Sequence, residues 1–311
     1  MKILTVSGIK DIKNIQMVDS HVHLWIEKPT TRSDYPIPSV TERTLIENCL
    51  KDFKNNGGDV VIDCTPYECG RNGKVLYDIS KVTGINILSV SGFHCKEYYP
   101  PDSKIWKFDE DKAANFFKKE VEQGLKETLA DGFNIKASVI KIPFVGMPKG
   151  DYLILTNAAI KIAIEMNVPI LVHTEQGKGV EWFSNFLLKS GVKPEKVVFC
   201  HVDKRNDILL HQKLAEQGFY LEYDTFLREK YNPDPNTYEL ISLMVKRGFG
   251  SKIMIGSDIS ENIMWKKIYE GQGYGGFFKG LKNTLESKLE NEKEVMNIMG
   301  GNAAEFLRIK N

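Results

Sequence analysis

The chain has 311 residues, of which 42% are hydrophobic and 27% charged, and its formal net charge is +1. This composition is typical of a globular protein with a large core, without the basic surface that recruits nucleic acid, and no apolar run approaches the roughly 18 residues of a membrane span. The five cysteines are odd in number and form no Cys-x-x-Cys pair, so together with the short apolar run at the start they predict reduced thiols in a cytoplasmic protein, with no nucleic-acid or membrane partner.

Residues 1–15 predict a short N-terminal hairpin or a lid under the rest of the fold. After them, short apolar runs rich in β-branched residues alternate with longer amphipathic stretches. The runs predict eight strands, at residues 16–21, 59–64, 86–91, 138–142, 169–173, 196–201, 219–223 and 252–257. The stretches predict helices at 39–56 (opened by a capping box of Ser39 and Glu42), 111–129, 156–165, 181–189, 204–217 and 238–246, and a helical tail at 277–288, 292–299 and 302–309.

Strands that alternate with helices indicate an α/β fold with a parallel sheet. Eight such units favour a closed (β/α)₈ barrel of the TIM type, a single domain over residues 1–311. The alternative is an open doubly wound sheet, which should carry a Gly-rich phosphate turn after its first strand. Here the first strand runs into His-Val-His, with no Gly-x-Gly-x-x-Gly nearby, so the barrel is favoured.

The first predicted strand leads into His21-Val22-His23. Residues two apart in a strand share a face, so both imidazoles are expected to point at one place, as a metal site requires. Two half-exposed histidines without a ligand are the simpler interpretation of the motif alone. Barrel active sites lie at the C-terminal ends of strands, so the other strand ends decide between the two interpretations.

Four more polar side chains are predicted at that end of the barrel: Lys141, His173, His201 and Asp258. Alone, each has a simpler explanation, since a histidine can be part of a core and an aspartate often caps a helix. Lys141 is different, because burying its charge inside an apolar strand is costly unless the side chain reaches outward. A neutral buried amine can instead add carbon dioxide and become a carbamate, an anionic ligand able to bridge two divalent ions.

These residues predict a binuclear metal site made of four imidazoles, a carboxylated Lys141 and Asp258. Two ions would share a hydroxide that attacks a carbonyl or phosphoryl group. Asp258 would bind one ion and carry the proton from the hydroxide to the leaving group. Histidine and carboxylate ligands suit Zn²⁺, Mn²⁺ and Co²⁺ alike.

As a set, these residues resemble the amidohydrolase superfamily, and the flanking sequences Pro-Ile-Leu-Val-His-Thr-Glu and Lys-Ile-Met-Ile-Gly-Ser-Asp are most similar to its phosphotriesterase and lactonase branch. The resemblance covers essentially the whole chain. It implies a distorted barrel with a binuclear, usually zinc-type, centre, and a homodimer. It also implies that His21, His23 and Asp258 hold a buried ion, that His173 and His201 hold an exposed one, and that carboxylated Lys141 bridges the two.

Two features depart from that branch. Val22 stands where a glutamate commonly separates the two histidines, which leaves the ligands intact. In many lactonase relatives an arginine directly follows the aspartate of the seventh strand, but here no arginine directly follows Asp224. This second departure speaks against acyl-homoserine lactones and organophosphates as substrates.

Loops that follow the strands are expected to select the substrate. Lys204, Arg228 and Tyr231 would place cations and a phenol at the mouth, which suits a phosphate or carboxylate, although solvated surface loops are the simpler explanation. The Arg-x-x-Tyr pattern with a lysine from the strand-6 loop is similar to the branch that opens lactones of phosphorylated sugars. Tyr98 or Tyr99 could orient the carbonyl or leaving oxygen, and residues 271–276 predict either a lid or a surface loop.

The sequence therefore predicts a metal-dependent hydrolase that opens a lactone ring, with an anionic small molecule, a phosphorylated sugar lactone, as substrate. A phosphotriester or carboxylic ester hydrolase is the enzymatic alternative. A metal-binding scaffold without catalysis is the alternative from another class. The intact ligand set speaks against the scaffold, because a degenerate site is expected to lose ligands.

Overall fold

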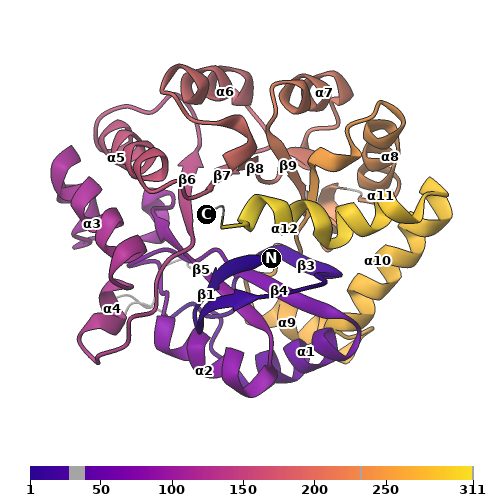
Figure 1. Cartoon of the computed structure of the whole chain (residues 1–311), viewed down its shortest axis with the longest axis horizontal. Helices are drawn as coiled ribbons and strands as arrows, with labels where there is room; N and C mark the ends of the chain where they lie inside the picture. Colours follow the sequence, from indigo (N-terminus) through magenta and orange to yellow (C-terminus); the bar gives the residue numbers. More distant parts are fainter. Residues whose placement is uncertain (28–38, 232, 310–311) are drawn as a thin grey trace.

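Eight parallel strands surrounded by helices form the body of the protein in the computed structural model, which describes residues 1–27, 39–231 and 233–309 (Figure 1). The strands pair in sequence order, each with the next. They are β3 (Met17–Val22), β4 (Gly58–Asp63), β5 (Asn86–Gly92), β6 (Val139–Phe144), β7 (Ile170–Thr174), β8 (Val197–Phe199), β9 (Tyr220–Tyr223) and β10 (Ile253–Ile255). The predicted α/β barrel is confirmed.

The barrel closes irregularly between its first and last strands. β3 and β10 share no regular ladder; instead a single parallel bridge joins Val22 to Ile259, and the backbone N–H groups of Ser257 and Asp258 donate to the His21 carbonyl at 3.2 and 2.9 Å. The pairing of β3 with β4 is also shifted between Asp19 and Val22. Such irregularities re-aim side chains and are frequent next to active sites, and here they flank the His-Val-His motif.

The helices surround the barrel, apart from α12, which lies over one of its ends. They are α1 (Arg43–Asn55), α2 (Gly73–Thr83), α3 (Glu110–Glu122), α4 (Lys126–Leu129), α5 (Asp151–Glu165), α6 (Val180–Lys189), α7 (Ile208–Glu216), α8 (Pro233–Lys246), α9 (Asn262–Glu270), α10 (Tyr274–Leu289), α11 (Glu292–Met296) and α12 (Asn302–Leu307). Among the described residues, no helix is both long enough and apolar enough to span a membrane. All five cysteines are buried and unpaired, as predicted.

Several expectations about the helices need correction. Neither α2 nor α9 was predicted, although the Asn72 side chain accepts from the Val75 N–H at 3.1 Å and caps α2. The helix predicted at 111–129 is two helices, because Gly124 takes a φ of +156° between α3 and α4. α1 begins at Arg43 with no side-chain cap, so the capping box is wrong. The predicted helix at 204–217 begins only at Ile208, after a 3₁₀ turn at Val202–Lys204.

The residues predicted as a lid or surface loop, 271–276, start a helix instead. α10 begins at Tyr274, whose buried hydroxyl donates to Asp19, and the Gly275 N–H donates to Asp52 of α1 at 2.8 Å. This segment therefore packs on α1. The lid expectation is wrong.

Alternation along the strands divides the core into an inner and an outer layer. Val139, Leu171, Val198 and Met254 pack together inside the barrel, and their neighbours Ile140, Val172, Phe199 and Ile255 pack in the cluster that faces the helices. Lys141 and His173 each lie two residues beyond an inner position. Because side chains two residues apart in a strand share a face, both side chains point into the barrel.

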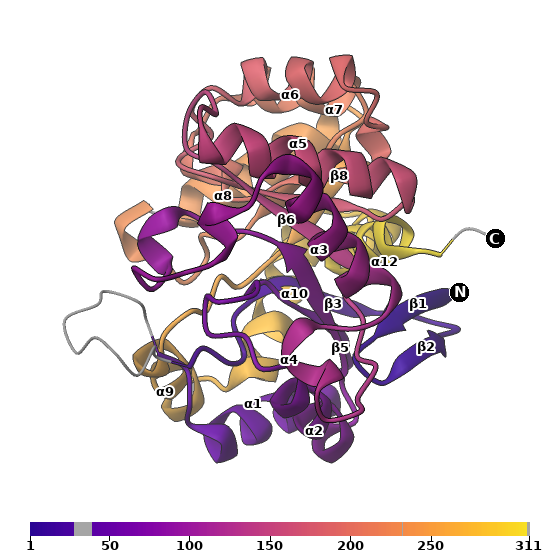
Figure 2. The ribbon, with the colours of Figure 1, turned by 90° about the vertical axis from the view of Figure 1, so that its left-hand side faces the viewer.

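A small plug closes the end of the barrel opposite to the C-terminal strand ends. The predicted hairpin is confirmed, with β1 (Lys2–Thr5) antiparallel to β2 (Gly8–Asp11). Ile3 of β1 and Phe306 of α12 join the inner core cluster, and the Ile309 N–H donates to the Lys2 carbonyl at 3.0 Å. Figures 1 and 2 show β1, β2 and α12 together over this end of the barrel.

Candidate metal centre and its cavity

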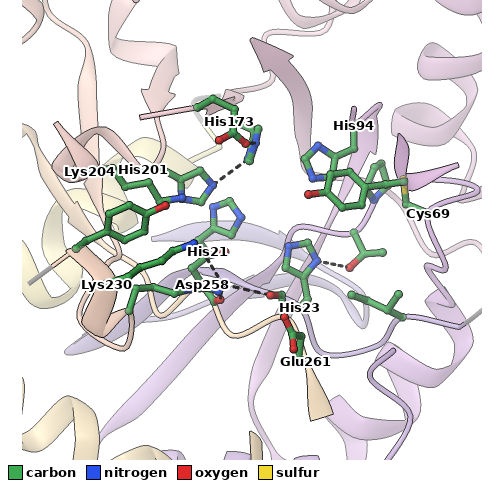
Figure 3. Close-up of a pocket in the computed structure, with 18 residues that line it drawn as sticks. His21, His23, Cys69, His94, His173, His201, Lys204, Lys230, Asp258 and Glu261 are labelled. Atoms are coloured by element: carbon green, nitrogen blue, oxygen red, sulfur yellow. Dashed lines mark hydrogen bonds and ion pairs between the residues drawn. The ribbon is translucent and has the colours of Figure 1, made fainter. Parts of the chain in front are cut away.

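A cavity of about 360 Å³ opens at the C-terminal ends of the strands. Figure 3 shows its lining side chains converging from both sides. Nine of the residues predicted for the site line it: His21, His23, Tyr98, His173, His201, Lys204, Arg228, Tyr231 and Asp258. The structure thus brings together side chains that lie up to 237 positions apart in the sequence, from His21 to Asp258.

One group of potential ligands consists of His21, His23 and Asp258, which each place one ligand atom within 4.8 Å of the others. His21 Nδ1 lies 2.8 Å from Glu222 Oε1, and His23 Nδ1 lies 2.7 Å from Thr65 Oγ1. Fixing Nδ1 in this way leaves Nε2 of each ring available, which is the usual arrangement of metal-binding histidines.

The second pair of histidines, His173 and His201, face each other directly. His173 Nδ1 and His201 Nε2 are 2.9 Å apart, while their other nitrogens lie 3.0 Å from Glu175 Oε1 and 2.7 Å from Asp224 Oδ2. Two ring nitrogens that converge, with a carboxylate beside each outer nitrogen, could hold a divalent cation. A cation between them would take the place of their mutual hydrogen bond.

Burial controls the protonation of these rings. It lowers the pKa of His173 to about 4 and the pKa values of His23 and His201 well below the ordinary range, with the Lys141 charge acting in the same direction. Burial also disfavours a charged His21, but the adjacent Cys64 and Glu222 outweigh it and raise the pKa of His21. Neutral imidazoles are the metal-binding form, and a cation would displace the proton of His21.

Lys141 of β6 is completely buried. Its Nζ donates to the Cys64 carbonyl at 2.8 Å, just beyond the end of β4, which is separated from β6 by β5. The side chain therefore points inward, as the prediction requires, and does not snorkel to the surface. After burial, its charge is among the causes that lower the pKa values of His23, His173 and His201.

Two of the candidate ligands sit in strained backbone. His201 has a φ of +62° and Asp258 a φ of +49°, values that cost free energy for residues other than glycine. β8 and β10 consequently end at Phe199 and Ile255, earlier than predicted. The left-handed turn after each strand redirects the side chain toward the cavity.

Cationic side chains form the rim of the cavity. Arg228 Nη2 donates to the Asp258 carboxylate at 2.9 Å and to its carbonyl at 2.7 Å. The ammonium groups of Lys204 and Lys230 lie 5.4 and 5.0 Å from the centre of the Tyr231 ring. Glu175 and Glu261 also line the cavity, so the rim is cationic but not uniformly so.

Tyr98 and Tyr99 have different environments. Tyr98 lines the cavity, whereas Tyr99 is buried behind it and accepts a hydrogen bond from the His94 N–H at 2.9 Å. The expectation that Tyr99 orients a substrate oxygen is therefore not supported by its position, because its ring packs edge-on against Trp106.

Several residues of the site were not predicted from the sequence. Thr65, Glu222 and Asp224 orient the histidines, and His94 lines the cavity. Glu222 is an acid inside a buried strand, which is the same kind of signal as Lys141. His94 follows β5 by two residues, so the strand-end rule also applies to it.

Comparison with known proteins gives a consistent result. The family model described as the phosphotriesterase family matches residues 1–307. The chain is 25% identical to the phosphotriesterase homology protein of Escherichia coli over 266 residues, covering 82% of this chain and 85% of that protein. It is 26% identical to a phospho-furanose lactonase of Mycoplasmopsis synoviae over 231 residues, which cover 71% of this chain and 65% of that protein.

The fold has a close counterpart among solved structures. A lactonase from Listeria monocytogenes superposes with a TM-score of 0.88 over 100% of both chains, at 22% sequence identity. Such a low identity supports the shared barrel and nothing finer. The match of the family model over nearly the whole length, however, is sufficient: the chain belongs to the phosphotriesterase family and is a hydrolase of that family.

Proposed function

We propose that this protein is a binuclear metal-dependent hydrolase that opens a lactone ring, with the lactone of a phosphorylated sugar as substrate. The observation that carries the proposal is the convergence of four imidazoles and Asp258 on one cavity whose rim is cationic, with the side chain of Lys141 buried inside the same barrel. The names of a relative and of a similar structure, a phospho-furanose lactonase and a lactonase, support the choice of a lactone.

The donor set fits two divalent cations. His21, His23 and Asp258 would hold one ion, His173 and His201 would hold the other, and a carboxylated Lys141 would bridge them. The inward-facing nitrogens of His173 and His201, 2.9 Å apart, are the observation that favours a cation between these rings. When bound, a pair of ions such as Zn²⁺, or Mn²⁺ or Co²⁺, supplies an activated water and a Lewis acid for the carbonyl oxygen.

Asp258 is the proton carrier in the proposed reaction. Its carboxylate takes the proton of the attacking water and returns it to the ring oxygen that leaves, so the ester C–O bond breaks without release of an alkoxide. The hydrogen bonds from Arg228 to both the carboxylate and the carbonyl of Asp258 hold it in one orientation. Preorganisation of this kind lowers the cost of reaching the transition state.

Lys204, Lys230 and Tyr231 are proposed to bind the phosphate of the substrate. Their side chains lie together at the rim, where two ammonium groups and a phenol match the charge and acceptor oxygens of a phosphate. Tyr98, on the wall, would contact the sugar.

A lactone panel tests the proposal. Metal-loaded protein is assayed for kcat/KM on five-membered sugar lactones with and without a 5-phosphate, and on paraoxon and 4-nitrophenyl acetate as ester controls. We expect the phosphorylated lactones to be preferred. A preference for paraoxon or the ester would establish the alternative hydrolase, and a protein that holds two ions but hydrolyses nothing in the panel would be a metal-binding scaffold.

We further propose a cytoplasmic homodimer with one domain spanning residues 1–311. The five buried, unpaired thiols suit a reducing compartment. Light scattering on the purified protein measures the mass of the particle, and a monomer or a tetramer would contradict the dimer.

A further inference from the structure

His94 is a cavity residue to which the proposed metal centre gives no role. Of the six histidines, His21, His23, His173 and His201 form the predicted ligand set. His211 is occupied elsewhere, with Nδ1 at 2.6 Å from the Tyr223 hydroxyl and Nε2 at 3.1 Å from the Val202 carbonyl. His94 lines the cavity beside His173.

The backbone holds His94 firmly in place. Gly92, at a φ of +91°, runs so close to β6 that a Cβ there would lie 2.1 Å from the Lys141 carbonyl oxygen. The Phe93 N–H donates to that same carbonyl at 3.0 Å, and the His94 N–H donates to the hydroxyl of buried Tyr99 at 2.9 Å. Tyr99 thus positions His94 and not the substrate.

The imidazole of His94 is aimed at the cavity. It stacks on Tyr98, with ring centres 4.5 Å apart and an interplanar angle of 19°, and it meets His173 edge-on at 4.6 Å. Figure 3 shows the ring directed inward, toward the space between His173 and His23. Its Nδ1 is buried and has no hydrogen-bond partner within the described part of the chain. A buried ring nitrogen in this position is the kind of group that a bound ligand satisfies.

We propose that His94 is a further catalytic residue, which donates a hydrogen bond from its imidazole N–H to the carbonyl oxygen of the substrate as that oxygen becomes negative. This inference rests on the proposed hydrolysis of a lactone or ester. An imidazole carries at least one N–H in either charged or neutral form, so the role does not depend on its titration. A donor that is already fixed in place stabilises a developing oxyanion without reorganising.

Two variants separate the donor from the shape of the ring. His94→Phe keeps a flat ring on Tyr98 but has no N–H, whereas His94→Gln loses the ring and keeps an N–H donor. We expect kcat of His94→Phe to fall by about 10²–10³-fold with KM little changed, as for loss of an oxyanion donor, and His94→Gln to keep most of the rate. A residue that only packs would show the opposite order.

Metal content distinguishes this role from metal binding. His94, Cys95 and His173 place ligand atoms within 4.8 Å of one another, so His94 could instead hold a cation with the buried thiol of Cys95. Mass spectrometry of the loaded proteins should find the same number of ions in wild type, in His94→Phe and in the neighbouring control Cys95→Ala. The kcat of Cys95→Ala should also equal that of wild type. Loss of an ion from both variants would overturn the proposal in favour of metal binding.

The remaining outcomes are also decisive. Equal rates for His94→Phe and wild type, or equal losses for His94→Phe and His94→Gln, overturn the inference. If wild type opens no lactone but turns over 4-nitrophenyl acetate, the lactone proposal fails while the same comparison on the ester still tests His94. Turnover of neither compound overturns both proposals.

Discussion

Each histidine of the proposed metal centre is oriented by a partner at its second ring nitrogen. The partners differ in kind: a buried carboxylate for His21 and His201, a hydroxyl for His23 and a half-exposed carboxylate for His173. A carboxylate makes the ring a stronger ligand than a hydroxyl does, because it stabilises the positive charge that develops on the imidazole. The outer partners therefore set the affinity of the centre as well as its geometry.

The substitution Glu222→Gln tests whether the outer partner of a histidine sets the metal affinity. Glu222 is completely buried, with Oε1 on His21 Nδ1 and Oε2 accepting from Ser20 Oγ at 2.6 Å, so glutamine preserves the volume and removes only the charge. We expect the metal affinity to fall by about 10–100-fold. Competition against a chelator, with the remaining ions counted by mass spectrometry, measures the change.

Glu175→Gln is the matched control for this substitution. Glu175 contacts His173 in the same way at 3.0 Å, but its side chain is 55% exposed, so solvent screens its charge. We expect a smaller loss of affinity than for Glu222→Gln. Unchanged affinity in Glu222→Gln would mean that the outer carboxylate does not tune the centre.

Asp258→Asn tests the proton carrier. Asparagine keeps an oxygen able to face a cation but cannot accept the proton of the attacking water. We expect kcat on the best lactone to fall by about 10²–10⁴-fold, the range of general acid–base catalysis, while the protein still binds two ions. A variant that retains both its ions and its rate would remove Asp258 from the proposed reaction.

At the residue scale, the sequence predicts which side chains meet but not how they are turned. His173 and Lys141 follow from strand parity alone, since each lies two positions beyond an inner residue of a regular strand. His201 and Asp258 reach the cavity only through left-handed backbone, at φ +62° and +49°, and no local pattern predicts that conformation. The partners of the histidines come from other strands, so their pairing depends on the closed barrel.

Helices and strands were predicted where their apolar pattern is long, and were missed where tertiary contacts decide where an element begins or ends. The strands are apolar because both of their faces are buried, which makes them easy to recognise. α2 begins at a glycine, and its start depends on the Asn72 cap. The break between α3 and α4 lies at Gly124, where a side chain at φ +156° would be strained.

A buried ion-pair cluster joins these less predictable elements. Arg71, between β4 and α2, has no exposed side-chain surface and donates to Glu120 of α3, to Glu127 of α4 and to the Val90 carbonyl of β5. Both contacts to Glu127 are 2.8 Å long. The guanidinium group therefore ties α3 and α4 to the barrel at the point where the helix breaks.

This cluster predicts a pH dependence of stability. Burial alone would raise the pKa of Glu127, but the charge and hydrogen bonds of Arg71 outweigh it and the pKa is lowered. The unfolded chain, with an ordinary glutamate pKa of about 4.3, then binds the proton first as pH falls. The stabilisation is therefore complete above that value and is lost as pH falls through the lower pKa of the folded state.

Urea unfolding of wild type and Glu127→Gln measures this dependence. At pH 7 we expect the variant to be less stable by about 1–3 kcal/mol, since it weakens a buried charged hydrogen-bond pair. The difference should shrink on acidification toward and below pH ~4, because wild type then loses the same contribution. Glu286→Gln, which alters an exposed carboxylate paired with Lys282 on α10, is the control and should show no such convergence.

The whole molecule separates chemistry and stability at opposite ends of one barrel. The C-terminal strand ends carry the cavity, with its strained turns and buried polar groups, whereas the other end is filled by Ile3, Ala303, Phe306 and Leu307. This division is general in barrels, where the strand ends that carry loops hold the active site and the opposite face contributes to stability. Substitutions at the two ends should therefore change different properties.

Phe306→Ala at the closed end tests this separation. Phe306 is 1% exposed and lies edge-on to Tyr220 of β9, with ring centres 5.5 Å apart, so its removal leaves a cavity under the barrel. We expect the free energy of unfolding to fall by about 3–5 kcal/mol, while the folded protein keeps its kcat/KM and its metal content. Ile309→Ala is the control. The Ile309 side chain lies just beyond α12 and is 37% exposed, so its removal should lower the free energy of unfolding much less. Urea unfolding and lactone assays on the same preparations compare the two properties. A loss of activity in Phe306→Ala as large as that of Asp258→Asn would show that the two ends are coupled. The C-terminal strand ends would then need the plug at the opposite end to hold the cavity side chains in place.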